Sequence, residues 1–160
     1  MTVGTILPFD RLAKALDEWA AAQTTAPELF AQVGELRTDS YRPRAFEWTE
    51  RVSPTEFRAR VAAADLVVTH AGIGTIITAL TLATPVLMMP RRAALNEHVN
   101  DHQLETVKHL SDRSGVTLAM EAEELGPQLE ALLNGVTSLP TLGYDAQNSL
   151  IAAIRDVILS

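Results

Sequence analysis

The sequence contains no cysteine, no long hydrophobic run and no excess of basic residues, and each absence excludes a class of protein. Without cysteine the chain has neither a disulfide framework nor a thiolate metal site, and its composition fits a reducing cytoplasm. No apolar run approaches the roughly 20 residues of a membrane-spanning helix, and no basic segment followed by an apolar one marks a signal peptide. The formal net charge of −7 leaves no basic excess to neutralise phosphates, so we expect no nucleic-acid partner.

Hydrophobic residues make up 47% of the 160 residues, while glycine and proline occur in ordinary amounts. A chain of this length buries one well-packed core and is too short for two large ones. No internal repeat or low-complexity segment interrupts it. We therefore expect a single domain over residues 1–160.

Stretches with the pattern of buried strands alternate along the chain with stretches of helical periodicity. We expect strands at residues 1–7, 29–33, 45–49, 66–69, 86–89 and 116–119. We expect helices at residues 10–23, 54–64, 97–111, 121–133 and 144–159, a further apolar helix directly after the strand at 66–69, and connections at 35–44 and 139–143. Such alternation predicts an α/β fold whose parallel sheet is covered by helices on both faces.

The stretch from Asp65 to Gln103 carries the strongest functional signal. A β-branched apolar run ends at the turn His70-Ala-Gly-Ile-Gly-Thr75, which opens an apolar helix and leads to a second apolar run. Glycine lets backbone N–H groups approach an anion closely, and the positive end of the helix lies at the same place. A tight turn that needs glycine for packing alone has the same spacing, and the spacing does not decide between the two.

Two known phosphate-binding motifs are absent from this turn. No lysine follows the glycines, as a Walker motif requires, and Ile77 stands where the dinucleotide fingerprint has its third glycine. The turn alone therefore indicates an anion site without naming its ligand.

Arg91 and Arg92 follow the second apolar run. In an acidic chain, a pair of arginines at the end of a buried strand is suited to a diphosphate, because each guanidinium donates two parallel hydrogen bonds. The alternative is a solvated surface pair, which the residues by themselves favour slightly.

A dense polar cluster follows, made of Glu97, His98, Asp101, His102 and Gln103. On the helix expected at 97–111 the two histidines are four residues apart and share a face, so they have the spacing of metal ligands. No third ligand is evident in the sequence. We therefore expect recognition of hydroxyl groups on a polar ligand, and no metal.

These segments are expected to converge at one edge of the sheet. Gly4 and Thr5, the turn at 70–75 and the polar stretch at 91–103 each follow a predicted strand. Ligands of open α/β sheets bind beyond the carboxyl ends of the strands. The pattern therefore predicts one ligand crevice built from three distant parts of the chain.

The residues from Ala64 to Thr75, followed by the strand after Pro85, the two arginines and Glu97-His-Val-Asn-Asp-His-Gln103, resemble the C-terminal domain of family 28 glycosyltransferases. The chain looks most like the short stand-alone versions. These are the small subunit of the two-subunit UDP-GlcNAc transferase of lipid-linked oligosaccharide synthesis and its bacterial exopolysaccharide relatives. Further similarity lies at Thr2–Thr5, Phe9–Leu12, Gly34, Tyr41–Pro43 and Ser53–Phe57, and it extends to about Leu110.

The resemblance implies that the domain is the Rossmann-like C-terminal half of a GT-B glycosyltransferase and binds a UDP-sugar donor. A separate membrane-anchored subunit would bind a polyprenyl-diphosphate-linked acceptor, to which a hexose is transferred at the cytoplasmic face of the membrane. The chain would then be cytoplasmic and peripheral to the membrane through that partner, with homo-oligomers left open. No acidic pair of the DxD type stands at a suitable place, so neither a divalent metal nor another cofactor is expected.

The resemblance also assigns roles to residues of this sequence. The donor diphosphate would lie on the turn and near an arginine, contacting Ala71, Gly72, Ile73, Gly74, Thr75 and Arg91 or Arg92. Glu97 and His98 would lie near the sugar, with Asp101 to Gln103 extending that cluster, while Gly4 and Thr5 would line the cleft facing the partner. The general base would lie on the partner, with His70 as a weaker local candidate.

Thr78 departs from the family pattern. Relatives commonly have a glutamate seven residues before the proline of the second strand, where it accepts both ribose hydroxyls, and here that position is threonine. A neutral hydroxyl makes a weaker contact. This departure keeps a noncatalytic nucleotide-binding or regulatory module as an alternative. A UDP-sugar epimerase on the same scaffold is a further alternative, and it would need a second domain that 160 residues do not accommodate.

Overall fold

The computed structural model describes residues 1–25 and 27–135. The strands are β1 (Phe30–Gln32), β2 (Glu47–Thr49), β3 (Val67–His70), β4 (Val86–Met89) and β5 (Val116–Leu118). The helices are α1 (Asp10–Ala22), α2 (Pro54–Ala63), α3 (Ile73–Thr81), the 3₁₀ turn η1 (Ala93–Leu95), α4 (His102–Leu110) and α5 (Ala122–Asn134). The connection predicted at 139–143 and the closing helix predicted at 144–159 lie outside the described residues.

The strands form two parallel sheets, β1-β2 and β3-β4-β5, which Thr2 joins. Thr2 makes one parallel bridge to Gln32, the last residue of β1, and another to Thr69 in β3. The strand predicted over residues 1–7 is therefore wrong in length, because only this residue pairs as a strand would. The backbone leaves the sheet direction at Gly4, whose φ of +82° is outside the β region.

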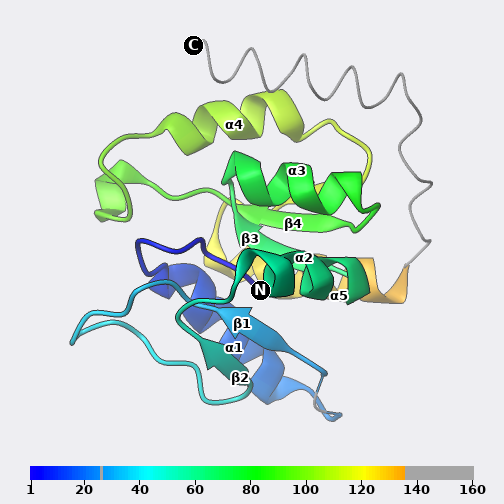
Figure 1. Ribbon diagram of the computed structural model, residues 1–160, viewed down its shortest axis with the longest axis horizontal. Helices are drawn as coiled ribbons and strands as arrows, with labels where there is room; N and C mark the ends of the chain where they lie inside the picture. Colours follow the sequence, from blue (N-terminus) through cyan, green and yellow to red (C-terminus); the bar gives the residue numbers. More distant parts are fainter. Residues whose placement is uncertain (26, 136–160) are drawn as a thin grey trace.

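Helices cover both faces of the sheet, as the alternation of elements predicts (Figure 1). One core cluster joins α2, α3 and α4 to the face that carries Val67, Val86 and Met88. The other joins α1 and α5 to the opposite face, where Val68 and Leu87 point. Successive strand residues thus enter opposite cores, which explains why these strands are apolar throughout.

The strand register brings the predicted ligand segments to the same level. His70, the last residue of β3, pairs with Met89, the last residue of β4. The glycine turn and the arginine loop therefore leave the sheet side by side at its carboxyl edge. This part of the predicted architecture is confirmed.

The helix predicted over 97–111 is shorter than expected. The chain after β4 forms η1, then turns and bends, and α4 begins only at His102. Asn96 adopts a left-handed conformation with φ +57°, which ends η1 and breaks helical continuity. The prediction that His98 and His102 share one helix face is therefore wrong.

Asp17 fixes the loop between β1 and β2 against α1. Its carboxylate, 5% exposed, accepts hydrogen bonds from the Tyr41 hydroxyl at 2.7 Å and from the N–H groups of Arg44 and Ala45 at 2.9 and 2.8 Å. Burial acts to raise the pKa of Asp17, but these hydrogen bonds outweigh it and lower the pKa below its usual value. The same contact raises the pKa of Tyr41 to about 12.

Asp17→Asn should lower the free energy of unfolding at neutral pH by roughly 1–2 kcal/mol, because neutral hydrogen bonds replace charge-assisted ones. A carboxyl with a lowered folded pKa stabilises the fold above its unfolded pKa, and this stabilisation is lost as the pH falls through the folded pKa. Urea unfolding from pH 7 to pH 3 should therefore show a smaller acid loss in the variant than in the unmodified protein. Tyr41→Phe, which keeps the charge, is the matched control, and equal acid losses in all three proteins would contradict the assignment.

Candidate functional site

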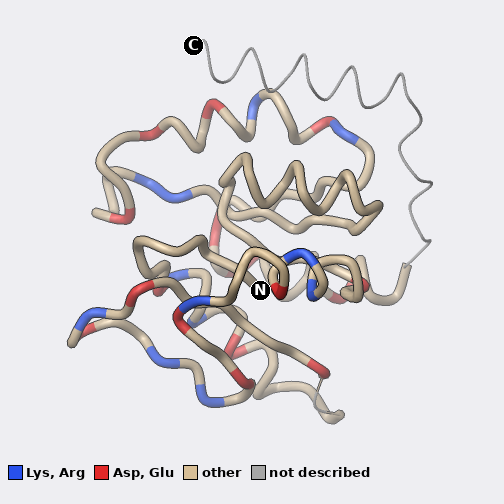
Figure 2. Tube along the Cα trace, viewed as in Figure 1, with Lys and Arg blue, Asp and Glu red and all other residues tan. Residues whose placement is uncertain are grey.

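The turn between β3 and α3 presents free backbone donors beside open space. Gly72 caps α3 without a side-chain hydrogen bond, and its own N–H binds the His70 carbonyl at 2.7 Å. The first N–H groups of a helix have no intrahelical acceptor, so those of Ile73, Gly74 and Thr75 face outward unpaired by the helix. A Cβ atom added at Gly74 would meet nothing within 4 Å. The local attraction for an anion comes from the helix end, since neither α3 nor β4 carries a charged residue (Figure 2).

The imidazole of His70 is packed between two glycines. A Cβ atom at Gly72 would lie 2.2 Å from His70 Nε2, and one at Gly4 would lie 3.4 Å from its Cε1. Burial, followed by the charge of Arg91, lowers the pKa of His70 to about 4. A general base works best with a pKa near the working pH, so this environment argues against His70 as the base.

Arg91 is buried and bound to carbonyl groups of the protein, and its predicted contact with a diphosphate stays a prediction. Its side chain is 2% exposed and stacks on the Phe9 ring, with 4.6 Å between Cζ and the ring centroid. Its guanidinium donates to four backbone carbonyls, those of Val3 at 3.1 Å, Leu7 at 2.7 Å, Pro8 at 2.6 Å and Glu97 at 3.3 Å. Burial lowers the pKa of Arg91 to about 10. The alternative prediction, that Arg91 and Arg92 form a solvated surface pair, is wrong for Arg91, because this residue is buried.

These four bonds tie together the two loops that flank the glycine turn. One loop follows Thr2 and contains Gly4 and Thr5, and the other follows β4 and contains η1. The side chain of Gln103, 3% exposed, supports the same loop from α4 by accepting the Arg91 N–H at 3.0 Å. Gln103 therefore supports this loop, and its predicted contact with the ligand stays a prediction.

Glu97 is likewise engaged within the protein. Its carboxylate accepts from Arg11 Nε at 2.7 Å and Nη2 at 2.9 Å, and from the Arg92 N–H at 2.9 Å. Arg11 also binds the carbonyls of Pro90 and Met120. With both carboxylate oxygens occupied and the side chain 12% exposed, Glu97 positions the loop, and its predicted place near the sugar stays a prediction.

The role of Arg11 is not predicted by the sequence. It lies 86 residues from Glu97 along the chain, so no spacing links them. One signal was available, because a cation in the first turn of a helix opposes the helix dipole and needs another partner. Helix α1 carries such a residue, Arg11, at its second position.

The remaining predicted residues lie on the outer part of the same loop. Arg92 forms an ion pair with Glu121 at 2.6 Å and is 27% exposed. Asp101 accepts the Ala93 N–H at 2.8 Å and so fixes η1. Thr78, on the exposed side of α3, donates its hydroxyl to the Gly74 carbonyl at 2.8 Å.

His98 and His102 meet by ring contact rather than on one helix face. Their rings are T-shaped with centroids 4.5 Å apart, and His102 Nδ1 bonds Asn100. Burial lowers the pKa of His98, and the nearby His102 and Arg91 lower it further. Its Nδ1 atom is buried and has no hydrogen-bond partner within the described part of the chain. Residues 1–25 and 27–135 contain no group of three or more histidine, cysteine or acidic side chains arranged to hold a metal.

Comparison with known proteins identifies the architecture. The model of the glycosyltransferase family 28 C-terminal domain matches residues 1–150. The chain belongs to this family.

Two relatives share the name UDP-N-acetylglucosamine–N-acetylmuramyl-(pentapeptide) pyrophosphoryl-undecaprenol N-acetylglucosamine transferase. The protein of Colwellia psychrerythraea is 32% identical over 126 residues, which cover 76% of this chain and 31% of the relative. The protein of Azotobacter vinelandii is 34% identical over 119 residues, which cover 71% of this chain and 32% of the relative. The family 28 domain described here thus spans about a third of the length of these relatives.

The crystal structure of the glycotransferase of kitacinnamycin shares the fold. It superposes with a TM-score of 0.55 and 19% identity, covering 98% of this chain and 38% of that one. The family 28 domain therefore has the fold of the C-terminal half of a GT-B glycosyltransferase, as predicted. Among its described residues, no helix combines the length and apolar character needed to cross a membrane.

Proposed function

We propose that this domain is the donor-binding half of a UDP-sugar-dependent glycosyltransferase. The observation that carries the proposal is the turn at Ile73–Thr75, whose unpaired N–H groups face open space at the carboxyl edge of a family 28 sheet. The names of the two relatives include UDP-N-acetylglucosamine, which supports uracil as the base of the nucleotide.

In this proposal the backbone of the turn holds the diphosphate and stabilises its charge as the sugar departs. Preorganised N–H groups are suited to this because they need no reorganisation when negative charge develops on the leaving group. The hydroxyl of Thr75 adds a donor. Of the two arginines after β4, Arg92 is the one that solvent and a ligand can reach. In this proposal His98 contacts the sugar.

The acceptor half is proposed to come from a membrane-anchored partner subunit that binds a polyprenyl-diphosphate-linked sugar. The relatives have about two thirds of their length beyond the matched region, and their names give an undecaprenol-linked acceptor. The base that activates the acceptor hydroxyl would lie on that partner. The domain would then act at the cytoplasmic face of the membrane, attached through the partner, in the assembly of an exopolysaccharide or a related lipid-linked glycan.

Two measurements test the proposal. Calorimetry should show tighter binding of UDP than of ADP, and equal affinities would count against a uridine site. Co-purification with a membrane-anchored partner, followed by a UDP-release assay, should show release only when both are present. Release that never exceeds background in the complex, with UDP binding intact, would favour a noncatalytic nucleotide-binding module.

Thr78→Glu should tighten UDP binding by about tenfold, because a carboxylate that accepts both ribose hydroxyls contributes roughly 1.5 kcal/mol or more. Thr81→Glu is the matched control, since it adds the same charge one turn later on an exposed position of α3. Titration calorimetry of both variants separates a ribose contact from a general charge effect. Unchanged affinity in Thr78→Glu would mean that the ribose is held by other residues.

A further inference from the structure

Three of the four large hydrophobic side chains that are exposed in the described residues lie at the carboxyl edge of the sheet. Ile6 is 74% exposed in the loop after Thr2, while Leu95 and Val99 are 50% and 89% exposed in the loop after β4. The fourth, Leu133, is 44% exposed on α5. Exposed apolar side chains that gather in one place mark a surface that another molecule covers.

The two loops that carry these three side chains are held together by Arg91. Its guanidinium donates to one carbonyl of each loop, that of Leu7 at 2.7 Å and that of Glu97 at 3.3 Å. Both loops extend beyond the same end of the sheet, on the left of Figure 1, beside the glycine turn. We call the three exposed side chains the apolar rim: Ile6, Leu95 and Val99.

Basic side chains without an acidic partner lie near the apolar rim. The loop after β1 begins beside it, because a Cβ atom added at Gly34 would lie 2.8 Å from the Leu7 carbonyl oxygen. Arg37 and Arg42 are exposed in this loop, and neither forms a salt bridge with a described carboxylate. Asp39 is the only acidic residue between them, so the two arginines leave this stretch net positive.

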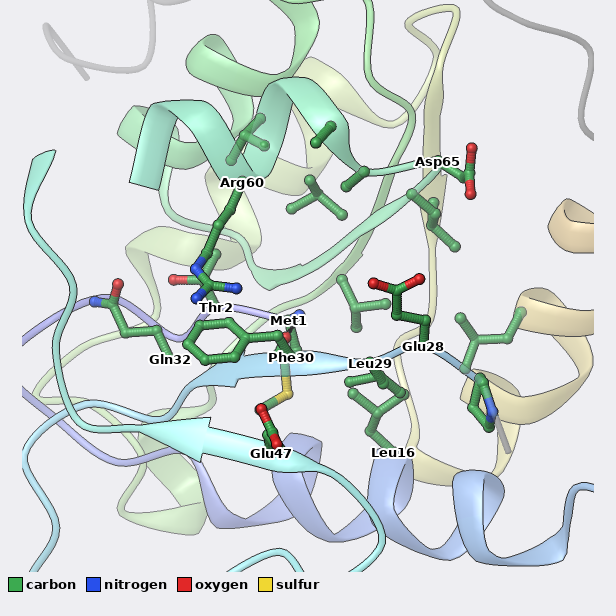
Figure 3. Close-up of a pocket in the computed structure, with 18 of the residues that line it drawn as sticks. Met1, Thr2, Leu16, Glu28, Leu29, Phe30, Gln32, Glu47, Arg60 and Asp65 are labelled. Atoms are coloured by element: carbon green, nitrogen blue, oxygen red, sulfur yellow. Dashed lines mark hydrogen bonds between the residues drawn. The ribbon is translucent and has the colours of Figure 1, made fainter. Parts of the chain in front are cut away.

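The opposite, amino edge of the sheet carries negative charge. Glu28, Glu47 and Asp65 are exposed there, line the cavity that Figure 3 shows, and take part in no salt bridge of the described residues. Arg60, the basic residue labelled in the same view, is paired with Glu56 at 2.9 Å. The net charge of the sequence is −7. An anionic surface would therefore repel the amino edge and leave the carboxyl edge as the side that approaches it.

We propose that the apolar rim enters the surface of a bilayer that contains anionic phospholipids, with Arg37 and Arg42 against the headgroups. Only side chains at the loop tips enter, because loop backbone is not accommodated in hydrocarbon. A protein interface would account for the apolar rim but not for the separation of charge between the two edges. The inference rests on the proposed function for its orientation, since transfer to a lipid-linked sugar turns the carboxyl edge toward the bilayer. It adds a direct contact to the attachment through a partner subunit.

Sedimentation of the full chain with vesicles of phosphatidylcholine and phosphatidylglycerol tests the proposal. The unmodified chain should bind, and the double variant Ile6→Asn with Val99→Asn should bind about tenfold more weakly or worse, because two apolar side chains are no longer buried. Leu133→Asn, which removes the exposed side chain outside the apolar rim, is the matched control and should bind normally. Arg37→Gln should weaken binding about fivefold on these vesicles and leave the weaker binding to pure phosphatidylcholine unchanged.

The absence of cysteine from the chain allows insertion to be measured directly. An environment-sensitive fluorophore attached at Val99→Cys should shift its emission to shorter wavelength on the vesicles, whereas the same label at Leu133→Cys should not. Equal shifts at the two positions, undiminished binding of the double variant, or binding that high salt abolishes and that produces no shift would overturn the proposal. Absence of vesicle binding by a chain that still binds UDP would also overturn it, while leaving the proposed donor site intact. Loss of partner co-purification in the double variant would then assign the apolar rim to a protein interface.

Discussion

Arg91→Met is expected to destabilise the domain by roughly 3–5 kcal/mol, the range typical of removing one partner from a buried charged network. The variant leaves the carbonyls of Val3, Leu7, Pro8 and Glu97 without their shared donor in a site that water does not reach. The same change frees the loops on either side of the glycine turn from each other. UDP affinity should therefore fall in the protein that remains folded. Urea unfolding and calorimetry below the unfolding transition measure the two effects separately.

Arg92→Met is the matched control for this prediction. Arg92 is the next residue and has the same side chain, but it forms an ion pair with Glu121, and these two side chains are 27% and 48% exposed. Ion pairs of this kind contribute on the order of 1 kcal/mol or less to stability. Similar destabilisation by the two substitutions would show that the four carbonyl contacts of Arg91 do not control the stability of this edge of the sheet.

The order of the elements and the convergence of the predicted site segments could be predicted from the sequence. The apolar runs at 66–69 and 86–89 are continuous because each strand feeds two cores, and local pattern carries that information. The glycine turn and its helix are also local, and so are the strand ends that bring them next to the arginine loop. The fold class and the meeting of the glycine turn and the arginine loop at the carboxyl edge follow from such features, and the structure confirms both. That a ligand binds there stays a prediction.

The contacts of the charged residues could not be predicted from the sequence, because their partners lie far away along the chain. Arg91 binds carbonyls 83 to 88 residues away and Arg11 binds a carboxylate 86 residues away. A sequence shows that a charge is present but not whether the protein itself supplies its partners. The sequence therefore predicts ligand contacts for Arg91 and for the polar cluster, whereas in the structure Arg91, Glu97 and Gln103 hold the loop.

Gly72 and Gly74, the two glycines of the turn, also differ in their surroundings. Gly72 has φ −87° and ψ 116°, which any residue adopts, so its need for glycine comes from the His70 ring and not from its backbone conformation. Gly74 lies in the first turn of α3 with open space around its missing side chain. Sequence spacing treats these residues as equivalent, whereas in the structure a side chain at Gly72 would clash with His70 and one at Gly74 would meet open space.

Gly72→Ala should lower the free energy of unfolding by roughly 1–3 kcal/mol, because the new methyl group overlaps the His70 ring and forces it to move. Adding His70→Ala should restore much of this loss, since the double variant removes the clash. Gly74→Ala, the matched control, should leave stability unchanged or raise it by about 0.5–1 kcal/mol through helix propensity. Its effect should fall on the ligand, as a methyl group beside the free N–H groups weakens UDP binding. Thermal melts and calorimetry of the three variants decide the matter, and a Gly74→Ala protein that binds UDP normally would move the diphosphate away from this turn.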